Sequence, residues 1–237
     1  MIIRNHFKLG PVKYHNVVAS IKGTKYPDEY VIISGHLDSY DVATGGIDCG
    51  TGIGPMMEAA RMIALSGAKP KRTILFVAFA GEEFGLLGAK SYVKTHAKEL
   101  GKIANLFNRD GGPTPPVGIS VPQAMYDDFV EVCKPVKEIR ADYPFEVKVA
   151  KPFKRPTQSG GTDASVFAVE GVPTFGFNTQ DIKGYNFSYG EIWHTERDLY
   201  TKNIPEYQEH AATVTAVVAL GIANLSKQLS REGMHKK

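Results

Sequence analysis

Two adjacent glutamates, Glu82 and Glu83, directly follow the apolar run 73–81. Neighbouring carboxylates at the end of a buried strand can divide two tasks, because one can bind a metal ion while the other moves protons. The pair is equally compatible with an acidic turn before a helix, where carboxylates favour the positive end of the helix dipole. Further candidate ligands are therefore needed to decide between the two interpretations.

Possible metal ligands also follow two other apolar runs. Residues 31–35 lead into His36 and Asp38, and residues 103–109 lead into Asp110. Because the carboxyl ends of parallel strands meet at one edge of a sheet, we expect these side chains to lie close to the two glutamates. Three predicted strands thus each end in possible ligands.

Two more candidates lie on predicted loops. Asp48 stands in the glycine-rich segment 41–52, and His194 stands in the segment 191–198. Zinc accepts imidazole nitrogen and carboxylate oxygen at about 2.0–2.2 Å, and a shared carboxylate can hold two metals roughly 3.5–4 Å apart. The residue types favour a pair of metals and a hydrolytic reaction, with Glu82 free to take a proton from the attacking water. The predicted ligands are His36, Asp48, Glu83, Asp110 and His194.

Strands that alternate with helices predict an α/β fold, a three-layer sandwich with a central mixed, largely parallel sheet flanked by helices. Tyr14–Ile21 and the strand from Tyr30 read as a hairpin. Glycine- and proline-rich residues 111–118 and the basic stretch 137–161 read as loops. The predicted helices cover residues 52–65, 86–100, 124–134, 163–169 and 204–229, and further buried strands begin at 73 and 103 and cover 173–178.

Length and composition fit one domain over residues 1–237. The chain has 43% hydrophobic and 22% charged residues, as in ordinary soluble proteins. No apolar stretch approaches the roughly 20 residues needed to span a bilayer, and residues 1–6 lack the apolar core of a signal peptide. The sequence can be a fragment of a longer precursor, so the expected location is secreted or periplasmic if a leader was removed, and otherwise cytoplasmic.

The net charge of +3 comes from scattered basic residues. Small clusters at 69–72, 151–155 and 235–237 are expected to be solvated loops and a frayed terminus, and no nucleic acid partner is predicted. Only Cys49 and Cys133 are present, so neither a disulfide framework nor a paired-cysteine zinc motif can form. Any metal must be held by histidines and carboxylates.

Six motifs follow, in order, those of the co-catalytic dizinc exopeptidases, and the chain resembles this family from Tyr14 to its C-terminus. The family includes bacterial leucyl aminopeptidases and plasma glutamate carboxypeptidase, and residues 36–41 and 70–73 are most similar to its carboxypeptidase Q branch. The motifs are His36-Leu37-Asp38, Gly46-Ile47-Asp48, Gly81-Glu82-Glu83, Asp110, Gly161-Thr162-Asp163 and Trp193-His194-Thr195.

The resemblance implies two Zn²⁺ per chain. It implies that Glu82 is the general base and later the acid, and that the Asp38 carboxylate orients the His36 imidazole. Cys49 departs from the family, which commonly has Asp or Asn there, often after a cis peptide bond. Arg109 can either pair with carboxylates or point away. One zinc is implied to bind His36, Asp48 and Asp110, and the other Asp48, Glu83 and His194.

The implied substrate is a small peptide or dipeptide, and a homodimer is possible. Asp163, Tyr185, Tyr189 and Trp193 are candidates for the substrate pocket, although core packing also explains aromatic residues there. Recognition of the amino or the carboxyl end of the peptide stays open. A glutaminyl-cyclase-like acyltransferase and a catalytically silent binding domain are the alternative functions on this fold.

Overall fold

A four-stranded sheet forms the centre of the computed structural model, which describes residues 2–6, 8 and 10–236. Its strands follow the order β1-β3-β2-β4, in which β3, β2 and β4 are parallel and β1 is antiparallel to β3. The bounds are Val17–Ile21 for β1, Tyr26–His36 for β2, Arg72–Phe79 for β3 and Ile103–Asn108 for β4.

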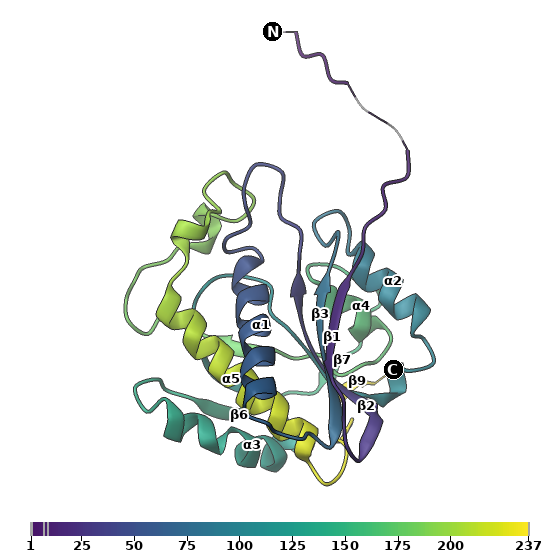
Figure 1. The fold of residues 1–237 in the computed structure, drawn as a ribbon, viewed down its shortest axis with the longest axis vertical. Helices are drawn as coiled ribbons and strands as arrows, with labels where there is room; N and C mark the ends of the chain where they lie inside the picture. Colours follow the sequence, from purple (N-terminus) through teal and green to yellow (C-terminus); the bar gives the residue numbers. More distant parts are fainter. Residues whose placement is uncertain (1, 7, 9, 237) are drawn as a thin grey trace.

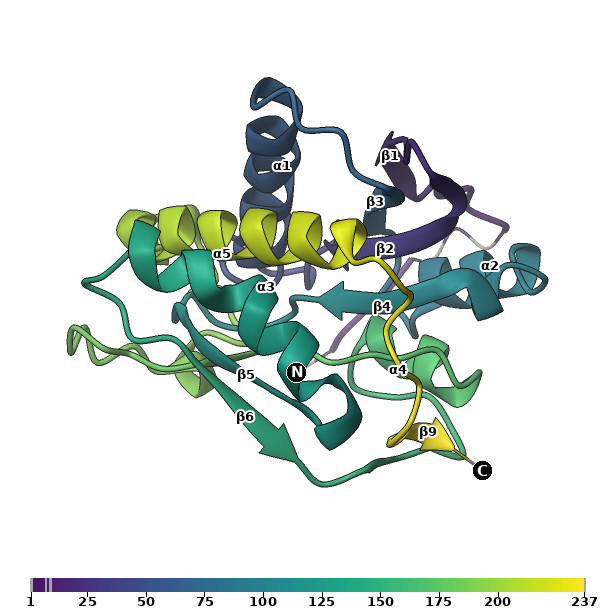
Figure 2. The same ribbon diagram turned by 90° about the horizontal axis from the view of Figure 1, so that it is seen from below.

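Alternate residues of β2 enter two separate apolar cores. Val31 and Ile33 pack with α1 (Gly50–Leu65) and α5 (Pro205–Asn224), whereas Ile32 packs with α2 (Leu87–Thr95) and α4 (Asp163–Val169). Because successive side chains of a strand point to opposite faces, this pattern requires helices on both sides of the sheet. Figures 1 and 2 show that arrangement, with α1 and α5 on one side and α2 and α4 on the other. The predicted three-layer α/β fold is confirmed.

The helices around the sheet follow the predicted pattern, with differences at their ends. The helix predicted over 86–100 ends at Thr95, and the chain then passes through a 3₁₀ turn, Leu100–Lys102. The closing helix ends at Asn224 instead of residue 229. The bounds are Gly50–Leu65 for α1, Leu87–Thr95 for α2, Asp163–Val169 for α4 and Pro205–Asn224 for α5.

The predicted hairpin is wrong, because β1 does not pair with β2. β3 lies between them and is hydrogen-bonded to both strands. The residues around Pro27 lie in an irregular part of β2, where the register shifts between Tyr26 and Tyr30. They therefore form no tight turn that could return β1 onto β2.

Two strands of a second sheet lie where loops were predicted, and its third strand overlaps the end of the strand predicted over 173–178. This sheet has the order β6-β5-β8, and its strands are Pro116–Pro122 for β5, Glu146–Ala150 for β6 and Phe177–Thr179 for β8. A bridge between Leu106 and Thr174 joins the segment before β8 to β4. The helix α3, Tyr126–Ile139, packs on this sheet and on α5, and it runs past the predicted end at residue 134 despite Pro135.

Two basic clusters are less exposed than predicted. Arg72 is 2% exposed and donates to Glu29 and to the carbonyl of Leu225. His235 is buried in the short strand β9, Met234–Lys236, which pairs with β7, Phe153–Lys154. Residue 237 lies outside the described residues. Among the helices that the structure describes, none is long and apolar enough to cross a membrane.

Candidate metal centre

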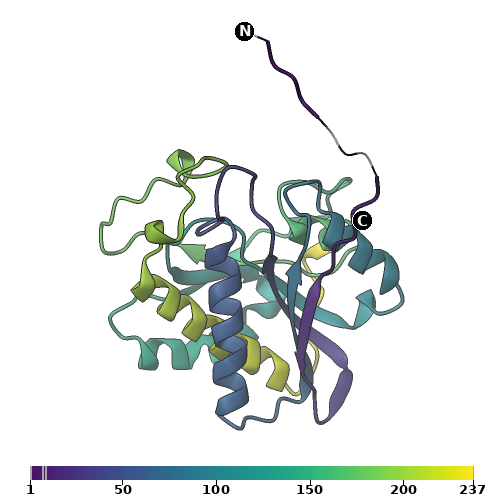
Figure 3. The same ribbon diagram turned by 45° about the horizontal axis from the view of Figure 1, so that its top comes forward.

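The predicted ligands come together at one end of the central sheet. His36 is the last residue of β2, Glu82 and Glu83 follow β3, and Asp110 follows β4. The three parallel strands end at the same edge, which is where open α/β sheets bind ligands. In Figures 1 and 3 the loop after β2 and the loop before α5 meet above this edge. These loops carry Asp48 and His194.

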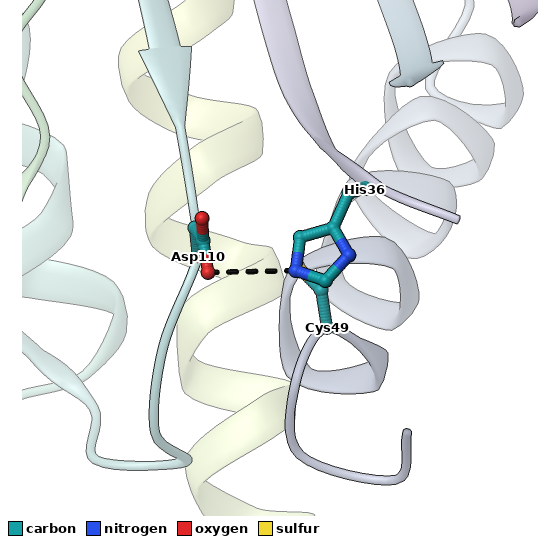
Figure 4. A group of neighbouring side chains, drawn as sticks. All are labelled: His36, Cys49 and Asp110. Carbon is teal, nitrogen blue, oxygen red and sulfur yellow. Dashed lines mark ion pairs between the residues drawn. The ribbon is translucent and has the colours of Figure 1, made fainter. Parts of the chain in front are cut away.

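His36 lies between two carboxylates. Its Nε2 is 2.8 Å from Asp48 Oδ1 and 3.5 Å from Asp110 Oδ1. Figure 4 shows the imidazole of His36 facing Asp110. His36 is 2% exposed and Asp48 is 3% exposed, so water screens these contacts weakly.

His194 forms the second part of the cluster with Glu83. Its Nε2 is 2.9 Å from Glu83 Oε2 and 3.9 Å from Asp48 Oδ2. The two oxygens of Asp48 therefore face different histidines, Oδ1 towards His36 and Oδ2 towards His194. A carboxylate that bridges two cations needs this arrangement, with one oxygen directed to each cation.

Asp38 contacts His36 through its backbone carbonyl and not through the carboxylate that the family resemblance implies. The Nδ1 of His36 is 3.0 Å from the backbone carbonyl of Asp38, whereas the nearest carboxylate oxygen of Asp38 is 3.9 Å away. That carboxylate instead accepts hydrogen bonds at 3.1 Å from the backbone N–H groups of Glu82 and Glu83. Asp38 thus orients His36 through its backbone and the glutamate pair through its side chain.

Burial, hydrogen bonds and neighbouring charges shift the pKa values of the cluster. Burial, reinforced by the charge of Asp110, raises the pKa of Glu82 to about 8. Burial and the neighbouring Asp48 also raise the pKa of Glu83. Burial opposes the ionisation of Asp48, but its hydrogen bond with His36 outweighs that effect and lowers the pKa of Asp48. For His36, burial is outweighed by hydrogen bonds to Asp110 and Asp48, which raise its pKa.

The donor set fits a divalent cation. Glu83 Oε1 is buried and has no hydrogen-bond partner among the described residues. His36, Asp48 and Glu83 each offer one ligand atom, and these three atoms lie within 4.8 Å of one another. A cation would satisfy the unpartnered oxygen and offset the charge of crowded carboxylates, whose burial is otherwise unfavourable.

Cys49 also lies beside His36 and Asp110, as Figure 4 shows, but its chemistry makes it a poor ligand. Its Sγ donates to the carbonyl of Arg109 at 3.0 Å, and burial raises the pKa of the thiol. Metals bind the thiolate, so a buried protonated thiol competes weakly with the nearby carboxylates. The Asp48–Cys49 peptide bond is cis.

A cavity of about 310 Å³ opens onto the cluster. Of the four residues predicted for the substrate pocket, only Trp193 lines it. Tyr189 stacks on Trp193, with ring centroids 6.4 Å apart, and lies close enough to the cluster that burial and the charges of Asp48 and Asp110 raise the pKa of its hydroxyl. The cavity is lined by Asp48, Glu82, Glu83, Gly85, Leu86, Lys90, Asp110, Ser159, Gly160, Gly161, Trp193 and His194.

Asp163 and Tyr185 do not line this cavity. Tyr185 packs against Tyr207 and its hydroxyl donates to Glu206, so it belongs to the neighbourhood of α5. Asp163 is fully buried at the start of α4, and neither carboxylate oxygen has a hydrogen-bond partner among the described residues. Burial raises the pKa of Asp163 to about 7.

Asp198 is a residue of the centre that sequence reasoning missed. Its carboxylate is buried and accepts hydrogen bonds from the backbone N–H groups of Ile47, at 2.7 Å, and Asp48, at 3.2 Å. A Cβ atom at Gly46 would lie 2.3 Å from the backbone next to Asp198, so only glycine allows the two loops to approach. Its position four residues after His194 is the only signal in the sequence.

Tyr40 and Arg109 also support the cluster. The ring of Tyr40 stacks on His194 with centroids 4.4 Å apart and an interplanar angle of 8°. The guanidinium of Arg109 pairs with no carboxylate among the described residues and donates to the carbonyls of Thr51, Gly112 and Thr114. It braces the chain beside Asp110 against the start of α1.

Comparison with known proteins identifies relatives of this chain. Residues 16–218 match the sequence profile of peptidase family M28. Carboxypeptidase Q of Rattus norvegicus is 32% identical over 231 residues, which is 95% of this chain and 46% of the relative. The chain thus spans about half the length of the curated relatives it matches.

Several solved structures are also similar to this chain. A peptidase M28 precursor from Shewanella amazonensis is 32% identical with a TM-score of 0.74, over 91% of this chain and 46% of that one. A zinc aminopeptidase from Bacillus subtilis has a TM-score of 0.66 at 20% identity, over 93% and 53% of the two chains. An Acidobacteriales glutaminyl cyclase has a TM-score of 0.62 at 17% identity, over 88% and 73%. The last two likenesses show the fold alone.

The family profile covers the strand ends, the Asp48 loop and His194, which are the segments that form the cluster. On this match, the chain belongs to peptidase family M28.

Proposed function

We propose that this chain is the catalytic domain of a zinc-dependent exopeptidase that hydrolyses a terminal bond of short peptides. One observation carries the proposal: the two oxygens of Asp48 face two separate sets of histidine and carboxylate donors. The family membership supports it, and so does the fold shared with a protein described as a zinc aminopeptidase.

The distances within the cluster support an assignment of residues to two metals. His36 and Asp110 would hold one zinc, Glu83 and His194 would hold the other, and Asp48 would bridge them. Nitrogen and carboxylate donors together favour zinc over magnesium or calcium, which prefer oxygen alone. When bound, the zinc ions would acidify a water molecule and polarise the scissile carbonyl.

We assign proton transfer to Glu82. Its side chain lines the cavity and makes no hydrogen bond with another described side chain or backbone group, so it is free to reach a water molecule or a substrate. Its backbone is fixed by Asp38, which limits how far the carboxylate can drift. Glu82 takes the proton of the attacking water and delivers it to the nitrogen of the leaving group.

Replacing Glu82 by Gln tests this assignment. A general base contributes about 10²–10⁴ to the rate, so zinc-loaded Glu82→Gln should lose at least a hundredfold in kcat on dipeptides while keeping its zinc. Amino acid release and metal analysis are measured together. Glu131→Gln, at an exposed glutamate of α3, serves as the matched control and should keep full activity. Substantial hydrolysis by metal-replete Glu82→Gln contradicts the assignment.

The alternative functions give different products. A glutaminyl-cyclase-like acyltransferase, whose fold is shared at low identity, would cyclise N-terminal glutamine with one zinc bound. A silent binding domain would release no product. Product analysis by mass spectrometry, combined with zinc stoichiometry, separates these two from the exopeptidase. The cluster favours the exopeptidase, because Asp48 lies between two sets of metal donors.

A further inference from the structure

One lysine side chain of the protein lines the cavity at the candidate metal centre. Lys90 is the one lysine among the lining residues, and no arginine lines the cavity. Lys90 is exposed and forms no ion pair among the residues that the structure describes. An unpaired ammonium group beside a substrate cavity is available to an anionic group of the ligand.

The position of Lys90 on α2 directs it towards the centre. Its backbone N–H donates to the carbonyl of Leu86, one turn earlier, at 2.9 Å. A long side chain on a helix leans towards the helix N-terminus and covers the preceding turn. For Lys90 that turn begins at Leu86, which lines the cavity together with Gly85, and both residues follow Glu83 after Phe84.

The acidic residues of the cavity have other roles. The lining carboxylates are those of Asp48, Glu82, Glu83 and Asp110, and the proposed function uses all four for metal binding or proton transfer. No further carboxylate in the lining is left to bind a substrate ammonium group. The protein side chain that remains for a charged end of a peptide is the cation Lys90.

We propose that Lys90 binds the α-carboxylate of the substrate, so that the preferred substrates are short peptides with a free carboxyl end. A cavity of about 310 Å³ is at the small end of ligand pockets and suits a dipeptide. This inference rests on the proposed function for the position of the reacting bond. It names the substrate class that the comparisons leave open.

A binding experiment tests the role of Lys90 without turnover. Zinc-loaded Glu82→Gln protein is titrated with alanyl-leucine and with alanyl-leucine amide, and the Kd values are measured by calorimetry. A hydrogen bond between charged groups changes affinity by about tenfold or more, so the free acid should bind about tenfold more tightly than the amide. Adding Lys90→Met should remove this difference, and adding Lys90→Arg should retain most of it.

Lys94 provides the matched control. It lies one turn further along α2, is exposed and does not line the cavity, so Lys94→Met should keep the preference for the free acid. If the protein that keeps Lys90 binds alanyl-leucine and alanyl-leucine amide with equal affinity, the proposal is overturned. A preference that survives Lys90→Met also overturns it, because the zinc ions alone would then account for carboxylate binding.

Kinetics then separate this proposal from the proposed function. In the protein with Glu82 intact, Lys90→Met should raise the KM for alanyl-leucine about tenfold and leave the KM for the amide unchanged. If the zinc-loaded protein hydrolyses neither peptide, the exopeptidase function fails, while the calorimetric preference for the free acid still supports Lys90. If it hydrolyses both with equal KM, only the role of Lys90 fails.

Discussion

The candidate centre has two sides, and they are held in different ways. On the strand side, His36, Glu83 and Asp110 lie at or just beyond the ends of β2, β3 and β4, whose backbones are joined by the hydrogen bonds of the sheet. On the loop side, Asp48 and His194 lie on segments that belong to no strand or helix. The sheet positions the first set, and individual side chains must position the second.

The contacts of the loop side show how this is done. Asp198 ties its own turn to the backbone of Asp48, and Tyr40 stacks on the ring of His194. His194 also has a φ of 59°, which is uncommon for a residue other than glycine. Neighbouring contacts must therefore hold it in place. We expect the loop side to be the more sensitive to substitutions outside the ligands themselves.

The largest effect is expected from the carboxylate that the two metals share. Asp48→Ala removes a ligand from both proposed zinc ions, whereas Asp110→Ala removes a ligand from one. After dialysis against zinc-free buffer, Asp48→Ala should keep fewer than one zinc per chain and Asp110→Ala about one. Metal analysis gives the counts, and circular dichroism checks that both variants fold. Retention of two zinc ions by Asp48→Ala contradicts a bridging role.

Asp198 tests whether the loop side depends on residues that touch no metal. Residues that orient metal ligands commonly change metal affinity by about 10–100-fold, so Asp198→Ala should weaken zinc binding within that range. Competition with a chromophoric chelator measures the affinity, and the cobalt-loaded protein should show an altered visible spectrum. Asp142→Ala, at an exposed aspartate after α3, is the matched control. An unchanged zinc affinity in Asp198→Ala indicates that the loop is held by other contacts.

The same division explains what could be predicted from the sequence. His36, Glu82 and Asp110 were predictable because each follows a run of apolar residues, and a sheet brings strand ends together. Asp198 was not, because its partners are backbone groups about 150 residues away in the sequence and leave no local pattern.

Local patterns failed in a similar way elsewhere in the chain. The strand β5 was missed because Pro116 and Pro122 stand at its ends, and β6 because it lies within the basic stretch 137–161. Tyr185 lies outside the cavity because it packs against Tyr207 of α5, a contact that the sequence does not reveal. The pairing of these strands and the position of Tyr185 depend on tertiary contacts, which composition and periodicity do not encode.

Tyr40 gives the smallest and most specific test of the loop side. Stacked aromatic pairs contribute about 0.5–1.5 kcal/mol, so Tyr40→Ala should weaken zinc binding about two- to tenfold by freeing the His194 ring. Tyr40→Phe keeps the ring and should bind zinc as the unmodified protein does, because the hydroxyl of Tyr40 makes no hydrogen bond among the described residues. A loss of affinity in Tyr40→Phe equal to that in Tyr40→Ala would assign the effect to the hydroxyl instead of the stacking. The N–H of Asp198 also donates to the carbonyl of Thr195 at 3.1 Å, which closes a turn just after His194. If neither variant changes the zinc affinity, this turn, and not the stacking, maintains the left-handed backbone of His194.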